Sequence, residues 1–137
     1  MSEISELNTQ RRTTSSNLTK KQNQLKADII LKEQYENFKE AIDTAKRKTK
    51  SAMIIMETVI TDYTSAYSSE VATENGNTLV EYKAEMETVR LGLEEIADDA
   101  TTKISDLEAE IADLEKDVAS LESDLKEIIN EINSYYS

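Results

Sequence analysis

Apolar residues near the C-terminus recur in steps that alternate between three and four residues for more than four heptads. The ten positions are Ile104, Leu107, Ile111, Leu114, Val118, Leu121, Leu125, Ile128, Ile132 and Tyr135. This spacing places all of them on one narrow stripe of a helix, which is typical of a helix that packs lengthwise on another helix. The stripe therefore predicts a packing surface and not a reaction centre.

Toward the middle of the chain, the stripe begins just after a turn signal. Asn75-Gly76-Asn77 favours a turn because Gly and Asn tolerate positive φ, and Thr78 followed by Glu81 is typical of a capping box. The sequence therefore predicts a turn over 68–78 and a helix over about 79–136. Upstream of Ile104 the stripe runs through Tyr82, Met86, Val89, Leu93, Ile96 and Ala100. Two successive four-residue steps, Ile96–Ala100–Ile104, predict a bend or short break near 98–103.

The first half of the chain carries a matching stripe and predicts a helix over about 3–67. Its positions are Leu31, Tyr35, Phe38, Ile42, Ala45, Thr49, Ala52, Met56, Val59, Tyr63 and Ala66. Residues 11–17 (Arg-Arg-Thr-Thr-Ser-Ser-Asn) are polar and have low helix propensity, so we expect a break in this helix there.

Two helices of similar length predict a single all-α domain over residues 1–137, folded as an elongated antiparallel helical hairpin or coiled coil. A turn near Gly76 would pair residues whose numbers add to roughly 146–150. The basic run 46–50 would then lie opposite Asp98-Asp99, Lys20-Lys21 near Glu127, and Lys26 near Glu122 and Asp124. A parallel dimer through the C-terminal stripe, and hence a homodimer, is the alternative.

Charge is distributed unevenly along the 137 residues, whose net charge is −12. Residues 1–50 carry 11 basic and 7 acidic side chains, whereas residues 51–137 carry 5 and 21. The acidic part repels nucleic-acid phosphates and anionic lipid headgroups. We therefore expect no nucleic-acid partner and no direct membrane insertion, and binding through residues 11–50 ranks last among the hypotheses.

Residue types that support catalysis are scarce in this sequence. It contains no His and no Cys, so the usual groups that titrate near neutral pH are missing. The acidic pairs Glu94-Glu95 and Asp98-Asp99 diverge on a straight helix and have no glycine-containing ligand loop around them. We expect no enzyme activity, no catalytic residue, no metal site and no cofactor. The polar N-terminus has no apolar segment typical of a signal peptide, which predicts a cytoplasmic protein.

Apolar residues that the hairpin stripe does not use are the candidates for binding a partner. They are Met53, Ile54, Tyr63, Tyr67, Val80, Leu91, Ile129 and Tyr136. In one interpretation they form a second surface for a helix from a partner or a second copy. In the other, Ile54, Val80 and Leu91 are isolated surface residues and the two tyrosines near the turn close the end of the hairpin.

Three segments resemble a known family. They are Leu18-Thr-Lys-Lys-Gln-Asn-Gln-Leu25, and the acidic repeats over 104–114 and 118–125. With the central break, they resemble the small helical accessory proteins encoded beside LXG toxins in Gram-positive type VII secretion systems, most of all the YwqH-like, WXG-like hairpins. The Trp-x-Gly of the exported hairpins is replaced by Glu74-Asn75-Gly76. The usual export signal of that family is an aromatic residue followed four positions later by an acid, and no Tyr or Phe here is followed in this way, so the resemblance implies that the signal comes from a partner.

The resemblance implies a chaperone-like role. The hairpin would lie along the helical N-terminal region of a toxin or effector, with or without a second small helical protein, and would cover its apolar face. It would help to present the toxin for export, remaining in the cytoplasm or leaving together with its partner. The competing hypothesis is a self-assembling coiled-coil scaffold or spacer.

Overall fold

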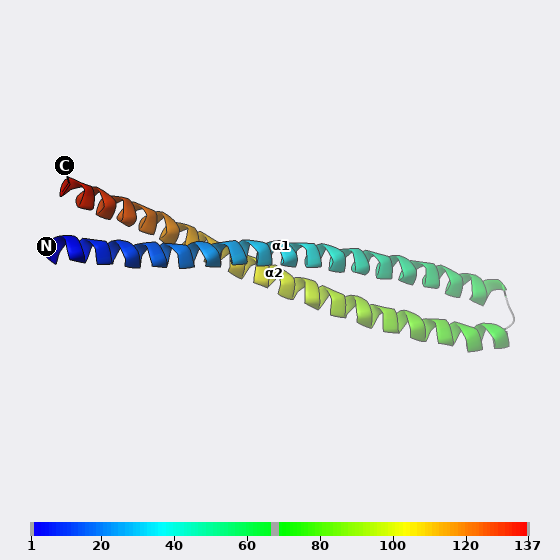
Figure 1. The fold of residues 1–137 in the computed structure, drawn as a ribbon. Helices are drawn as coiled ribbons and strands as arrows, with labels where there is room; N and C mark the ends of the chain where they lie inside the picture. Colours follow the sequence, from blue (N-terminus) through cyan, green and yellow to red (C-terminus); the bar gives the residue numbers. More distant parts are fainter. Residues whose placement is uncertain (1, 67–68, 137) are drawn as a thin grey trace. The chain divides into compact units, whose positions relative to one another are not determined.

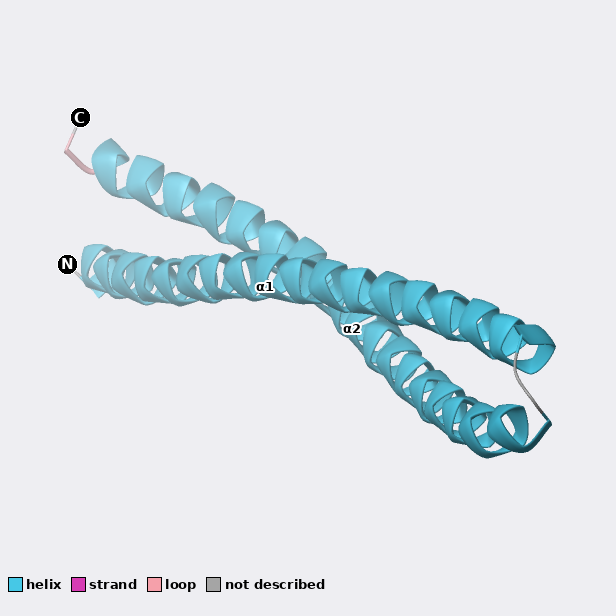
Figure 2. Cartoon of the chain, turned by 90° about the vertical axis from the view of Figure 1, so that its right-hand side faces the viewer, coloured by secondary structure: helices cyan, strands magenta, loops and turns pink. Residues whose placement is uncertain are grey.

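The computed structural model describes residues 2–66 and 69–136, with side chains described over 3–62 and 76–136. These residues form two helices, α1 (Ser2–Ala66) and α2 (Ser69–Ser134), which pack against each other (Figures 1 and 2). The prediction of an all-α helical hairpin is confirmed.

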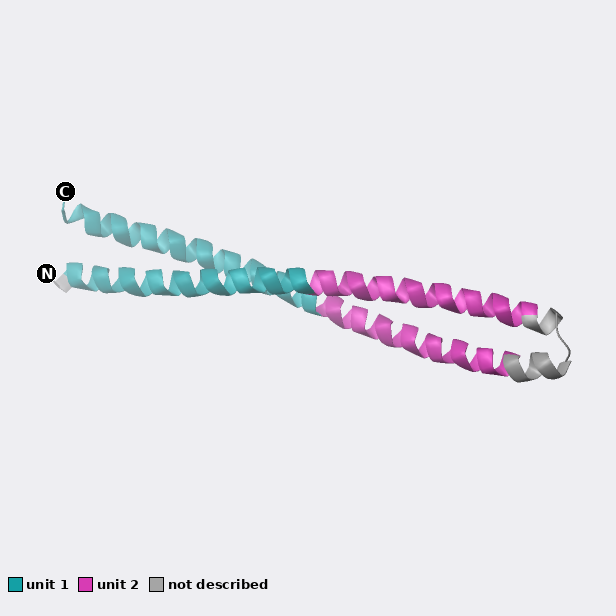
Figure 3. Ribbon diagram, turned by 45° about the vertical axis from the view of Figure 1, so that its right-hand side comes forward, with its two compact units in different colours: residues 1–34, 103–137 teal, residues 35–102 magenta. Residues whose placement is uncertain are grey.

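Contacts divide the chain into two compact units, each made of one segment from each helix (Figure 3). Unit 1 comprises Met1–Gln34 and Lys103–Ser137, and unit 2 comprises Tyr35–Thr102. Within unit 1 the two chain ends lie near each other, because the Tyr135 hydroxyl donates a hydrogen bond to the Glu3 carboxylate.

The predicted turn over 68–78 is wrong, because α2 already begins at Ser69 and not at Leu79. Asn75-Gly76-Asn77 lies inside the helix, and no described residue has positive φ. A glycine inside a helix costs only about 1 kcal/mol, which the cooperative extension of the flanking turns outweighs. The helices are joined instead at residues 67–68, which lie outside the described residues.

The predicted breaks in the two helices are also wrong. α1 is helical throughout 11–17, and α2 is helical throughout 98–103. Threonine is a poor helix former, but its cost of up to about 0.7 kcal/mol per residue is small beside the cooperative extension of the flanking turns. Within a helix its hydroxyl can donate to the backbone carbonyl four residues earlier. Thr19, Thr101 and Thr102 do so, at oxygen–oxygen distances of 3.0–3.2 Å.

Because the helices are joined at residues 67–68 and not near Gly76, the register of the two helices differs from the predicted one. The numbers of ion-paired residues add to 138 for Lys21–Asp117 and to 140 for Lys32–Glu108 in unit 1 and for Lys83–Glu57 in unit 2. The predicted sum of 146–150 is therefore wrong. The charge pairings that depend on that register are wrong as well. They are the basic run 46–50 with Asp98-Asp99, Lys20-Lys21 with Glu127, and Lys26 with Glu122 and Asp124.

Each helix turns one series of mostly buried or half-buried side chains toward the other, here called the buried stripe. In α2 it passes through Leu79, Lys83, Met86, Arg90, Leu93, Ala97, Ala100 and Ile104 and continues to Ile132. In α1 it passes through Tyr35, Lys39, Ile42, Lys46, Thr49, Met53, Met56 and Ile60. Its steps alternate between three and four residues, so the irregular step at Ile96 disappears.

The two units differ in how well their interiors are filled. In unit 1 the side chains of Leu107, Leu114 and Ile132 are buried. Among the described residues of unit 2, the buried apolar side chains are those of Ala97 and Ala100. Since the free energy of burial scales with apolar area, the described part of unit 2 gains much less from packing within the chain.

Candidate interaction surface

Charged side chains gather along one edge of unit 2. Arg90 donates from Nε to Glu87 Oε2 at 3.0 Å, and its Nη1 lies 3.5 Å from Glu94 Oε2. The hydrogen bond from Arg90 lowers the pKa of the Glu87 carboxyl, and the same bond raises the pKa of Arg90. On the facing helix, Glu57 lies 3.7 Å from Lys83 Nζ.

The two helices turn these charged side chains to the same side. Asp43, Lys46, Arg47 and Lys50 of α1 share a groove of about 420 Å³ with Arg90 of α2. We call this side the charged edge of unit 2. It consists of Asp43, Lys50 and Glu57 of α1 and Glu87 and Glu94 of α2.

Apolar side chains lie on the side of the buried stripe opposite the charged edge. In each helix they occupy the positions one residue before every second residue of the stripe. This apolar edge consists of Phe38, Ala45, Ala52 and Val59 of α1 with Tyr82, Val89 and Ile96 of α2. A spacing of seven residues keeps each set in one row along its helix. Because both helices place their charged edge on one side, their apolar rows lie together on the other side.

The five large side chains of the apolar edge are exposed, although they are hydrophobic, and Ala45 and Ala52 are half-buried. The exposed fractions of its five large side chains run from 40% for Val59 to 55% for Val89. Several neighbouring positions in the buried stripe are occupied instead by cations: Lys39, Lys46, Lys83 and Arg90. Such side chains lay their apolar stems along the facing helix while the charge reaches water. Within the described part of unit 2, these five large side chains therefore stay exposed.

The corresponding edge of unit 1 is polar. Its α2 positions are occupied by Lys103 and then by acidic side chains such as Glu110 and Asp117. On α1 the equivalent positions are polar as far as Gln24, whose amide donates to Glu110 at 3.1 Å, and only Leu31 is apolar. The exposed apolar row on both helices is thus a property of unit 2.

The sequence-predicted partner-binding residues do not form one surface. Met53 lies in the buried stripe and faces α2, whereas Ile54, Val80 and Leu91 are exposed on the side of the charged edge. The side chain of Tyr63, and Tyr67 altogether, lie outside the described residues. Ile129 and Tyr136 belong to unit 1.

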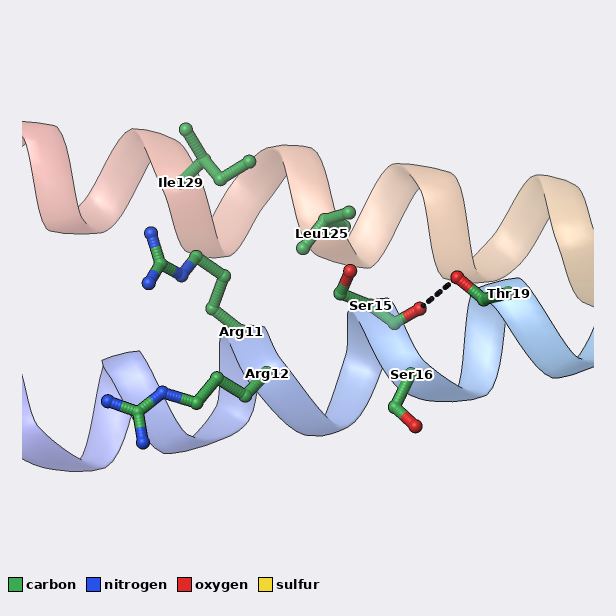
Figure 4. A pocket seen from close by; sticks show the side chains of 7 residues that line it. All are labelled: Arg11, Arg12, Ser15, Ser16, Thr19, Leu125 and Ile129. Atoms are coloured by element: carbon green, nitrogen blue, oxygen red, sulfur yellow. Dashed lines mark hydrogen bonds between the residues drawn. The ribbon is translucent and has the colours of Figure 1, made fainter.

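Ile129 lines an open groove of about 540 Å³ in unit 1 (Figure 4). Leu125 of α2 lies on the same side of the groove as Ile129, and the other side is lined by five residues of α1: Arg11, Arg12, Ser15, Ser16 and Thr19. The Thr19 hydroxyl is already engaged with the Ser15 carbonyl. The groove combines two cations with hydroxyl groups and only two apolar side chains, which does not favour an apolar helix as its ligand.

The residues of the apolar edge escaped sequence reasoning because they fit a heptad stripe so well. Phe38, Val59, Tyr82, Val89 and Ile96 were all assigned to the contact between the two helices. The irregular step at Ile96 is the sequence signal that could have shown this. If Ala97 and not Ile96 is assigned to the α2 stripe, the steps become regular and Ile96 lies outside the stripe.

Neither helix, over its described residues, has a segment long and apolar enough to cross a membrane. Among the same residues, no three acidic side chains come together in a way that suits a metal ion. No family model matches the chain, and no curated protein or solved structure is significantly similar to it.

Proposed function

We propose that this chain is a non-enzymatic partner protein that binds a helical segment of another protein on the apolar edge of unit 2. The observation that carries the proposal is the pair of exposed apolar rows, one on each helix, that lie on the same side. An amphipathic helix laid along two such rows buries apolar side chains every seven residues, as in a helix bundle.

The resemblance to accessory proteins of LXG toxins supports a specific partner. We propose that the ligand is the helical N-terminal region of such a toxin, and that the hairpin covers it before export by a type VII secretion system. The acidic sequence, which contains no His and no Cys, suits a binding role, since this role needs no reacting group of its own. Residence in the cytoplasm, or export together with the toxin, follows from the same proposal.

The test uses the purified full chain and the helical N-terminal region of a candidate LXG toxin. We expect complex formation by calorimetry and a rise in melting temperature on mixing, because a ligand that binds only the folded state stabilises it. Absence of binding at micromolar concentrations would contradict the toxin as partner.

Two neighbouring residues of α2 make a matched pair for locating the contact. Val89 belongs to the apolar edge, whereas Leu91 is similarly exposed on the opposite side. We expect Val89→Glu to weaken toxin binding at least tenfold, about 1.4 kcal/mol, and Leu91→Glu to leave it unchanged. The reverse result would place the partner on the side of the charged edge.

A further inference from the structure

Gly92 lies in the interior of α2, where the contacts within the chain do not require a glycine. A Cβ built at this position meets no atom within 4 Å, and the residue is exposed. Glycine inside a helix costs about 0.5–1 kcal/mol relative to alanine. The monomer gains nothing visible in return for this cost.

The position of Gly92 connects it to the apolar edge. It follows Val89 by three residues and precedes Ile96 by four, so the three lie on one face of α2. A missing Cβ beside two apolar side chains lets the backbone of another helix approach closely. Gly92 therefore has a use only when a helix is docked there.

The side chains around Gly92 indicate the charge of that helix. Glu85 and Asp99 lie seven residues before and after Gly92 in the same row, and neither has an ion-pair partner within the described part of the chain. Over residues 69–102 the sequence has 9 acidic and 2 basic side chains. A second copy, at net charge −12, would be repelled.

Resting on the proposed function, we infer that the partner segment is a basic amphipathic helix that crosses α2 at Gly92. Its apolar stripe covers Val89 and Ile96, and lysine or arginine side chains beside that stripe pair with Glu85 and Asp99. The acidic side chains in this row favour a partner of positive charge, and Gly92 sets the point where the two helices approach most closely.

Two designed peptides test this inference with the full chain. Both are amphipathic and about four heptads long with leucine at a and d; one carries lysine and the other glutamate at the flanking positions. By fluorescence anisotropy at low salt, we expect the lysine peptide to bind at least tenfold more tightly. Glu85→Gln with Asp99→Asn should reduce this preference, as should added salt. Equal binding of the two peptides, or binding of neither, overturns the inference.

Variants at Gly92 test the crossing point. We expect Gly92→Leu to weaken binding of the lysine peptide at least tenfold, whereas Ala84→Leu, an exposed control on the opposite side of α2, leaves it unchanged. Gly92→Ala should raise the melting temperature of the free chain, which shows that the fold tolerates a side chain there.

Other outcomes separate the inference from the proposed function. If Val89→Glu abolishes toxin binding but Gly92→Leu does not, the apolar edge binds the toxin and the crossing point is wrong. If light scattering shows a dimer that Gly92→Leu converts to a monomer, a second copy occupies the edge and the inference is overturned.

Discussion

Asp28 lies in the buried stripe of α1, among side chains that offer its carboxylate few hydrogen-bond donors. Its Oδ2 atom is buried and has no hydrogen-bond partner among the described residues. A buried polar atom without a partner costs about 1–3 kcal/mol. We expect Asp28→Leu to raise the free energy of unfolding by about this amount, measured by urea denaturation. Asp106→Leu, at an exposed position of the same unit, is the control and should change it little.

Tyr135 and Glu3 make the hydrogen bond that joins the chain ends in unit 1. This bond, with a smaller effect of desolvation, raises the pKa of Tyr135. A raised pKa in the folded state means that the stabilisation is complete below the unfolded pKa of about 10 and is lost as the pH rises through the folded value. We expect Glu3→Gln to lower the pKa of Tyr135, followed by NMR of its ring carbons. Glu6→Gln should leave it unchanged, and an unchanged value in Glu3→Gln would contradict the contact.

At the scale of the helix, continuity prevails over local signals. Asn75-Gly76-Asn77 has the composition of a turn, yet it is helical because it lies within the first turns of α2 and the long remainder of that helix continues from it. Asn77 is exposed, so its replacement tests helix propensity without disturbing packing. We expect Asn77→Ala to raise the free energy of unfolding by about 0.5 kcal/mol. A turn residue replaced by alanine would instead lose stability.

The sequence was sufficient for the helices and for the heptad spacing, but not for the face that each helix buries in unit 2. The stripe through Phe38 and Val59 is more apolar than the stripe through Lys39 and Lys46, and both have the same period. Periodicity alone cannot distinguish stripes that differ by a rotation of one residue. The C-terminal stripe from Ile104 was predictable because most of its flanking positions are acidic, which leaves a single continuous apolar stripe.

At the scale of the molecule, the two units are expected to open at different rates. Unit 1 buries leucine and isoleucine side chains, whereas the described part of unit 2 buries only alanines and Gly76. Sparse apolar burial favours local opening. By hydrogen exchange, we expect faster exchange for amides over 83–93 than over 107–118. A bound basic helix should reduce this difference. Uniform exchange along α2 in the free chain would contradict the prediction that unit 2 opens more readily than unit 1.

The unbroken alternation of three- and four-residue steps makes length a modular property of this chain. Removing residues 18–24 together with 115–121, which face each other in unit 1, rejoins both buried stripes at the same heptad position. We expect that paired deletion to keep a cooperative thermal transition by circular dichroism, and removal of only 18–21 to broaden or abolish it. Such a hairpin can gain or lose reach during evolution only by whole heptads taken from both helices at once, so descendants of different length would share one cross-section.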